Sequence, residues 1–122
     1  MTLSFSRNIA PSINAELRKA WEARTARDTQ AEFTHLERAH VLGQESTYWH
    51  TKVHFLMLMY AVRNKKMQEI VGQIIRLIGA ATKTVFGLVP RGNTGGANVS
   101  PFRKMPIPAD LAILIERARS KS

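Results

Sequence analysis

The sequence contains no cysteine, few aromatic residues and only one acidic residue in its central half. Because none of the 122 residues is cysteine, disulfide bonds, thiolate metal sites and cysteine nucleophiles are excluded. The longest apolar run, residues 53–62, is interrupted by His54 and is far shorter than the ~20 residues of a membrane span. Residues 1–11 lack the basic start and long apolar stretch of a secretory signal. We therefore expect a cytoplasmic protein that does not associate with membranes.

What is present is typical of one small globular domain. Hydrophobic residues make up 44% of the chain and charged residues 22%, which are close to the averages for folded proteins. A chain of this length forms one domain and buries enough surface for a core. We expect a single domain over residues 1–122, with a helical core, a tail and a terminal helix at 12–85, 86–107 and 108–119.

The positive charge is concentrated in the middle of the chain. Residues 1–46 hold six basic and six acidic residues, whereas residues 47–109 hold nine basic residues and the single acid Glu69. Arg63, Lys65 and Lys66 cluster at a predicted turn and are candidate phosphate contacts for a nucleic acid or another acidic partner. No nucleic-acid-binding motif accompanies them, so a solvated basic face is the alternative.

Hydrophobic spacing predicts an all-α fold with four main helices. We expect them over about residues 12–25, 29–43, 47–64 and 66–85. Pro11 suits the entry of the first helix, Asp28 is a good N-cap for the second, and Gly43 ends it. Short connections predict two antiparallel hairpins, 12–42 and 47–85, arranged as a tetratricopeptide-like array or an irregular bundle.

The later helices have different surfaces. The third is apolar nearly all round between Val53 and Val62, which predicts a central buried helix. The fourth combines an apolar stripe with a polar face that includes Glu69, Gln73 and Arg76.

The chain changes character after Phe86. Four of the seven glycines and four of the five prolines lie within residues 87–108. Such a long irregular segment is usually functional or disordered, but this one also carries many apolar residues. We expect it to lie ordered across the helices, either alone or on binding, before the short closing helix.

Histidine placement is the most specific chemical signal. Glu37 and His40 are three residues apart and His50 and His54 are four apart, so each pair shares one helical face. The short connection between these helices brings the two pairs to one end of the fold. Imidazoles with a carboxylate suit zinc, copper or nickel. The alternative is a purely structural cluster of buried, hydrogen-bonded side chains; His35 falls away from this face.

The Gly-rich segment 90–100 is a second candidate site. Backbone amides at glycines can surround an anion, which makes this stretch a candidate anion-binding loop: Arg91, Gly92, Asn93, Thr94, Gly95 and Gly96. It lacks the Gly-Lys-Ser/Thr ending of a phosphate-binding loop. A series of tight turns is the simpler interpretation.

Several stretches resemble a known family. They are His-Leu-Glu-Arg-Ala-His-Val-Leu-Gly-Gln at 35–44, Gly-Asn-Thr-Gly-Gly-Ala-Asn-Val-Ser at 92–100 and Met-Pro-Ile-Pro at 105–108. From about residue 14 to 117 the chain resembles small bacterial proteins grouped as a domain of unknown function. The resemblance implies an all-helical bacterial protein, often carried on mobile DNA, with His40, His50 and His54 at patterned positions.

No serine lies on a nucleophile elbow and the chain has only nine acidic residues, so an enzyme is poorly supported; an acid or base among His40, His50 and His54 is the alternative left open. We expect a binding or interaction protein with a transition-metal or small-ligand site at the histidines. The alternatives are a basic nucleic-acid or acidic-partner module and self-association through the fourth or closing helix.

Overall fold

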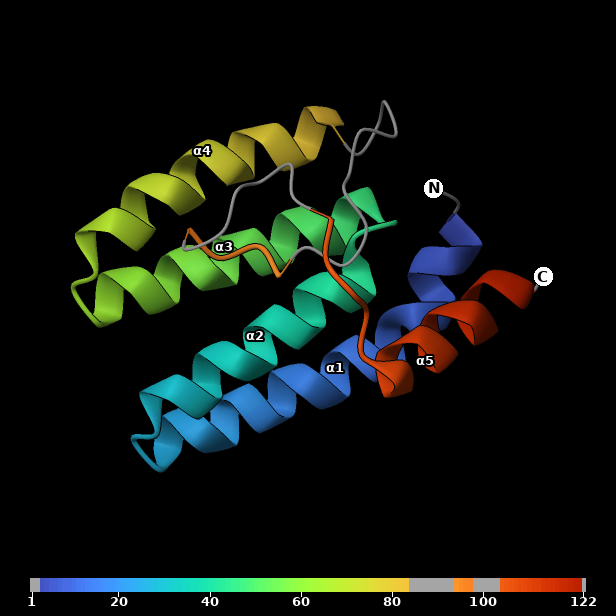
Figure 1. Ribbon diagram of the computed structural model, residues 1–122, viewed down its shortest axis with the longest axis horizontal. Coiled ribbons are helices and arrows are strands. Elements are labelled where there is room, and N and C mark those ends of the chain that lie inside the picture. The colour runs from blue at the N-terminus through green and yellow to red at the C-terminus, as the bar shows by residue number, and fades with distance from the viewer. Residues whose placement is uncertain (1–2, 84–93, 98–103, 122) are drawn as a thin grey trace.

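The protein is all-helical in the part that a computed structural model describes, residues 3–83, 94–97 and 104–121. These residues contain five helices and no strand: α1 Leu3–Thr25, α2 Thr29–Gly43, α3 Thr47–Arg63, α4 Met67–Lys83 and α5 Ala109–Ser120. In Figure 1, α1 lies beside α2 and α3 beside α4, while α5 crosses the N-terminal end of α1. The predicted all-α class is confirmed. Within the described residues, no helix is long and apolar enough to cross a bilayer.

Helix α1 begins nine residues earlier than predicted, because Pro11 lies inside it instead of at its entry. An interior proline costs about 3 kcal/mol. Phe5, Ile9 and Ile13 recur every four residues and are all buried, so the apolar stripe continues through the proline. Burial of each such side chain contributes about 1.5–3 kcal/mol, which outweighs the lost hydrogen bond. The axis of α1 bends in its N-terminal part (Figure 1), as expected near a proline.

The predicted starts of the second and third helices are confirmed by their caps. The Asp28 carboxylate accepts a hydrogen bond from the Ala31 N–H at 3.0 Å. The Ser46 hydroxyl accepts one from the Trp49 N–H at 3.2 Å. Both side chains satisfy a backbone donor that the first helical turn leaves unpaired.

Gly43 ends α2 as predicted, but for a different reason. The following residue, Gln44, has a φ of −57°, so no left-handed cap is formed. A Cβ on Gly43 would lie 2.8 Å from the Cβ of Trp49. The missing side chain therefore lets the start of α3 close against the end of α2, which brings the two histidine-bearing turns together.

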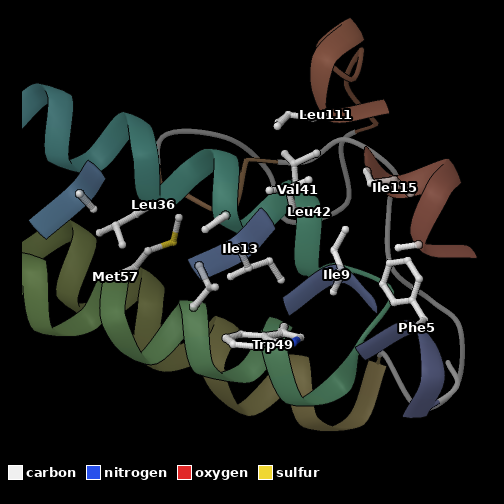
Figure 2. Close-up of a cluster of buried hydrophobic side chains, with 14 of the residues drawn as sticks. Phe5, Ile9, Ile13, Leu36, Val41, Leu42, Trp49, Met57, Leu111 and Ile115 are labelled. Carbon is white, nitrogen blue, oxygen red and sulfur yellow. The ribbon is translucent and has the colours of Figure 1, made fainter. Parts of the chain in front are cut away.

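The core lies between α1, α2, α3 and α5. Figure 2 shows its buried apolar side chains, which include Ile13, Leu42, Met57, Leu111 and Ile115. Trp49 packs at the end of the core nearest the N-terminus. Its indole N–H donates to the carbonyl of Ser6 at 2.9 Å. Helix α5 therefore belongs to the core and does not only end the chain.

Helices α3 and α4 are less enclosed than the sequence predicts. Val53 and Met57 are fully buried, but Phe55 and Val62 are about half exposed, so the prediction that α3 is buried all round is wrong. In α4, Gln73 is fully buried while Ile78 is 69% exposed. The side of α4 that the sequence predicts to be polar therefore faces the interior. It does so because His54 and Gly95 provide hydrogen-bond partners for Gln73.

Only part of the predicted tail 86–107 lies within the described residues, namely 94–97 and 104–107. Ile107 packs against the core. The closing helix starts at Ala109, one residue later than predicted. The expected order of the remaining tail falls on residues that the structure does not describe.

Candidate metal centre

Three histidine side chains meet where α2 and α3 adjoin. His40 comes from the last turn of α2, and His50 and His54 come from successive turns of α3. The Nε2 atom of His54 lies 3.0 Å from that of His40 and 3.2 Å from that of His50. All three candidate ligand atoms lie within 4.8 Å of one another. The structure thus brings together three of the four residues that the sequence grouped.

The cluster is buried. His40, His50 and His54 are 2%, 7% and 3% exposed. Their ring centroids are 4.6–4.9 Å apart, with the His40 ring edge-on to the other two. The rings pack against one another, and the Nε2 atom of His54 lies close to those of both other rings.

Burial keeps two of the imidazoles uncharged. The pKa of His50 is lowered from 6.5 to about 3, mainly by desolvation and also by the neighbouring His54. The pKa of His54 is lowered to about 4, mainly by desolvation; the hydrogen bond to Gln73 opposes the shift and the charge of Arg76 contributes to it. Neutral imidazole is the form that binds a metal ion.

Gln73 of α4 determines which nitrogen of His54 carries the proton. Its Nε2 donates to the carboxylate of Glu69 at 2.6 Å and to the carbonyl of Gly95 at 2.8 Å. Since both partners accept only, the amide oxygen faces His54, whose Nδ1 lies 2.6 Å away. The His54 Nδ1–H therefore donates to Gln73, which leaves a lone pair on Nε2.

Gln73 and Glu69 also form hydrogen bonds with a short tail segment, residues 94–97, that lies over the cluster. The N–H of Ala97 donates to the Glu69 carboxylate at 2.9 and 3.2 Å. Gly95 has a φ of +87°, and a Cβ there would lie 2.6–2.8 Å from atoms of the His40 ring. Glycine is thus required at position 95 both by its backbone conformation and by the ring beneath it.

Glu37 lies apart from the three imidazole nitrogens. Among the described residues, the group close enough to share one ion contains the three histidines alone. Burial raises the pKa of Glu37, the charge of Glu69 raises it further, and a hydrogen bond with Thr94 lowers it. Its carboxylate therefore faces the tail and α4, on the periphery of the cluster.

The predicted anion-binding loop is described only in part. Arg91, Gly92 and Asn93 lie outside the described residues, while Gly95 and Gly96 are buried. The carbonyl of Gly95 accepts from Gln73, so this backbone serves the histidine cluster. Anion binding by the segment as a whole stays a prediction.

The predicted phosphate contacts are already engaged in part. Arg63 pairs with the buried Glu32 at 2.7 Å, and the Lys66 ammonium lies 5.5 Å over the Tyr60 ring. Lys65 is exposed and has a φ of 54°. Nucleic-acid or acidic-partner binding by this turn stays a prediction. The fourth histidine, His35, pairs with Glu16 at 2.7 Å, away from the cluster.

The sequence did not place Gln73 or Gly95 at the histidine cluster. Gln73 was assigned to a polar face of its helix and Gly95 to an anion-binding loop. For Gln73 the spacing of apolar residues does not show which side of α4 the chain covers. Gly95 carried no signal beyond its place in a Gly-rich stretch, since its contact with His40 joins residues 55 positions apart.

The distances between the nitrogens are close to those of a metal site. Three imidazoles bound to one zinc ion at 2.0–2.1 Å in tetrahedral geometry have nitrogens about 3.3 Å apart. The two short separations, 3.0 and 3.2 Å, match this value. Gln73 and Glu69 stand behind His54 as the supporting partners that orient a ligand.

Comparison with known proteins gives a family for the chain. No curated protein and no solved structure matches it. One family model, described as "Protein of unknown function (DUF3703)", matches residues 7–115. The resemblance to a domain-of-unknown-function family is thereby confirmed, and the chain belongs to the DUF3703 family.

Proposed function

We propose that this protein binds a transition metal ion, with zinc, copper and nickel as candidates, through His40, His50 and His54. One observation carries the proposal: three buried imidazoles from two helices place their candidate ligand nitrogens within 4.8 Å of one another. The proposed role is binding, and the ligand set is one that all three metals accept.

Hydrogen bonding among the rings is a weaker explanation of this geometry. With its Nδ1–H donated to Gln73, His54 has a single lone pair at Nε2. Two other Nε2 atoms approach that lone pair at 3.0 and 3.2 Å, and one lone pair makes only one good hydrogen bond. A cation that accepts a lone pair from each ring satisfies all three nitrogens together.

In this proposal the metal joins elements that are distant in the chain. The first four helices act as two antiparallel hairpins, in the tetratricopeptide-like or irregular-bundle arrangement. The ion links α2 to α3 through the histidines. Gln73 extends the link to α4 and to Gly95 of the tail, so binding rigidifies the end of the fold.

Thermal unfolding with Zn²⁺, Cu²⁺ and Ni²⁺ tests the proposal. A ligand at 100 times its Kd stabilises the folded state by about 2.7 kcal/mol, which raises the Tm of a domain this size by about 10 °C. We expect such a shift in the wild type and in the His35→Ala control. A His50→Ala/His54→Ala variant should show none. Absence of any shift in the wild type, or an equal shift in the double variant, contradicts the proposal.

A further inference from the structure

Helix α4 carries an apolar surface that no described element covers. We define the α4 face as Met67, Val71, Ile74, Ile75 and Ile78, which follow helical spacing along one side. These side chains are between 46% and 70% exposed. Among the described helices, α4 packs closely only against α3, and Figure 1 shows it as the outermost helix.

The charged side chains of α4 that the structure describes are on another side. Glu69 accepts the Ala97 N–H, and Arg76 donates to the carbonyl of Gly72 at 3.2 Å. Position 72 is also where α4 meets the tail, because a Cβ there would lie 2.5 Å from that of Ala97. The α4 face is therefore uncharged and points away from the metal centre.

The α4 face is large for an exposed apolar surface. With about 200 Å² for a fully exposed large apolar side chain, its five residues present roughly 600 Å². The largest apolar patch on a typical monomer is about 300–600 Å², so this surface is large enough to indicate an interface.

We propose that the α4 face is the two-fold interface of a homodimer. Two copies would together bury about 1,200 Å², which is the lower end of the standard size range of stable interfaces. An apolar face without charges is complementary to itself, as a two-fold contact requires. Pairing α3 and α4 with their copies forms a four-helix bundle, the usual way in which a two-helix layer covers its exposed side.

The charges nearby agree with a second copy. Lys65 and Lys66 lie at the turn that precedes α4, at one end of the face. A two-fold axis across the middle of α4 places the two basic turns at opposite ends of the bundle, where they do not repel each other. An anionic membrane would instead favour cations along the whole face.

Sedimentation equilibrium of the full chain tests the dimer independently of metal binding. We expect the wild type to have twice the chain mass of 13.7 kDa at 200 μM. An Ile75→Lys/Ile78→Lys variant should be monomeric, with a dissociation constant raised at least 100-fold. Ile113→Lys changes another exposed isoleucine, on α5, and should leave the dimer intact.

A second variant tests the interface without introducing a charge, so that misfolding of the double-lysine variant is not mistaken for dissociation. Because the chain has no cysteine, an Ile75→Cys variant can be cross-linked only through that position. We expect a short bis-maleimide to join two chains at this site, and not in an Ile113→Cys control. A wild type that stays monomeric at 200 μM, a double-lysine variant that stays dimeric, or a monomer that binds phosphatidylglycerol vesicles through this face would each overturn the proposal.

Discussion

Acidification should destabilise the metal-free protein through its buried imidazoles, at a pH where most carboxylates are still ionised. In the unfolded chain, His50 and His54 titrate near their ordinary pKa of 6.5. In the folded protein their pKa values are about 3 and about 4. Between these values the unfolded state binds more protons than the folded state, so stability is full above pH 6.5 and is lost as the pH falls.

The size of the effect follows from the two pKa differences. Each group that stays neutral while its unfolded counterpart is protonated costs about 1.4 kcal/mol per pH unit. From pH 7.5 to pH 5 the two histidines together lower the free energy of unfolding by about 4 kcal/mol. This is a large part of the 5–15 kcal/mol that stabilises a typical domain. Glu37 acts in the opposite direction, because its pKa is raised in the folded state.

Urea denaturation of the chelator-treated protein at pH 7.5, 6.5, 5.5 and 5 measures this dependence. We expect His50→Leu, which replaces the imidazole with an apolar side chain of similar size, to remove about half of the loss. His35→Gln should leave it unchanged, because His35 lies outside the cluster and pairs with Glu16.

A free energy of unfolding that changes by less than 1 kcal/mol over this range in the wild type would be incompatible with two buried, neutral imidazoles. It would mean that the imidazoles are open to water, and hence that the buried cluster does not exist as described. An unchanged dependence in His50→Leu would have the same consequence for that residue.

Other contacts lead to further predictions. Gln73→Leu removes the acceptor of the His54 N–H and the donor to two oxygens. We expect it to lower the free energy of unfolding by about 2–4 kcal/mol in urea denaturation and to weaken zinc affinity 10–100-fold by calorimetry. Unchanged zinc affinity would argue against a role of Gln73 in orienting His54. Gly95→Ala forces a Cβ into the ring below it and should lower the Tm by several degrees, with a smaller zinc-induced shift; an unaltered Tm would mean that the segment does not cover the cluster. Arg63→Met leaves Glu32 buried without its partner and should lower the free energy of unfolding by about 3 kcal/mol. Lys65→Met, at an exposed position, should lower it by less than 0.5 kcal/mol. Equal losses in the two variants would contradict the buried ion pair.

Much of the helical architecture follows from local rules. Asp28 and Ser46 have the side chains that cap a helix, and the predicted capping role of Asp28 and the predicted start of the third helix are confirmed. The start of α1 was not predictable from Pro11, because the residues that compensate for the proline pack against α5, more than 100 positions away. Local patterns carry no information on that contact.

The histidine cluster was partly predictable, because local spacing determines which side chains share a helical face. The spacing of His50 and His54 places both on one face of α3, and the short connection from α2 brings His40 beside them. Glu37 satisfies the same spacing rule, yet its carboxylate faces Glu69 and Thr94. Which member of a pair turns inward depends on α4 and the tail, whose positions are set by tertiary packing.

The burial of α4 could not be derived from its hydrophobic stripe. The stripe predicts which residues share a side of the helix, but not whether the chain itself covers that side. Gln73 is inside because His54 and Gly95 provide partners for its amide. The isoleucines of the α4 face are outside because no described element lies over them.

The most direct test of the metal centre is a long-range ¹H–¹⁵N NMR spectrum of the histidine rings during titration with Zn²⁺. We expect the Nε2 signals of His40, His50 and His54 to shift together and to stop changing at one equivalent, while those of His35 are unaffected. If the ring signals of His40, His50 and His54 are unchanged at one equivalent of Zn²⁺, or if only those of His35 shift, the proposed metal centre is wrong.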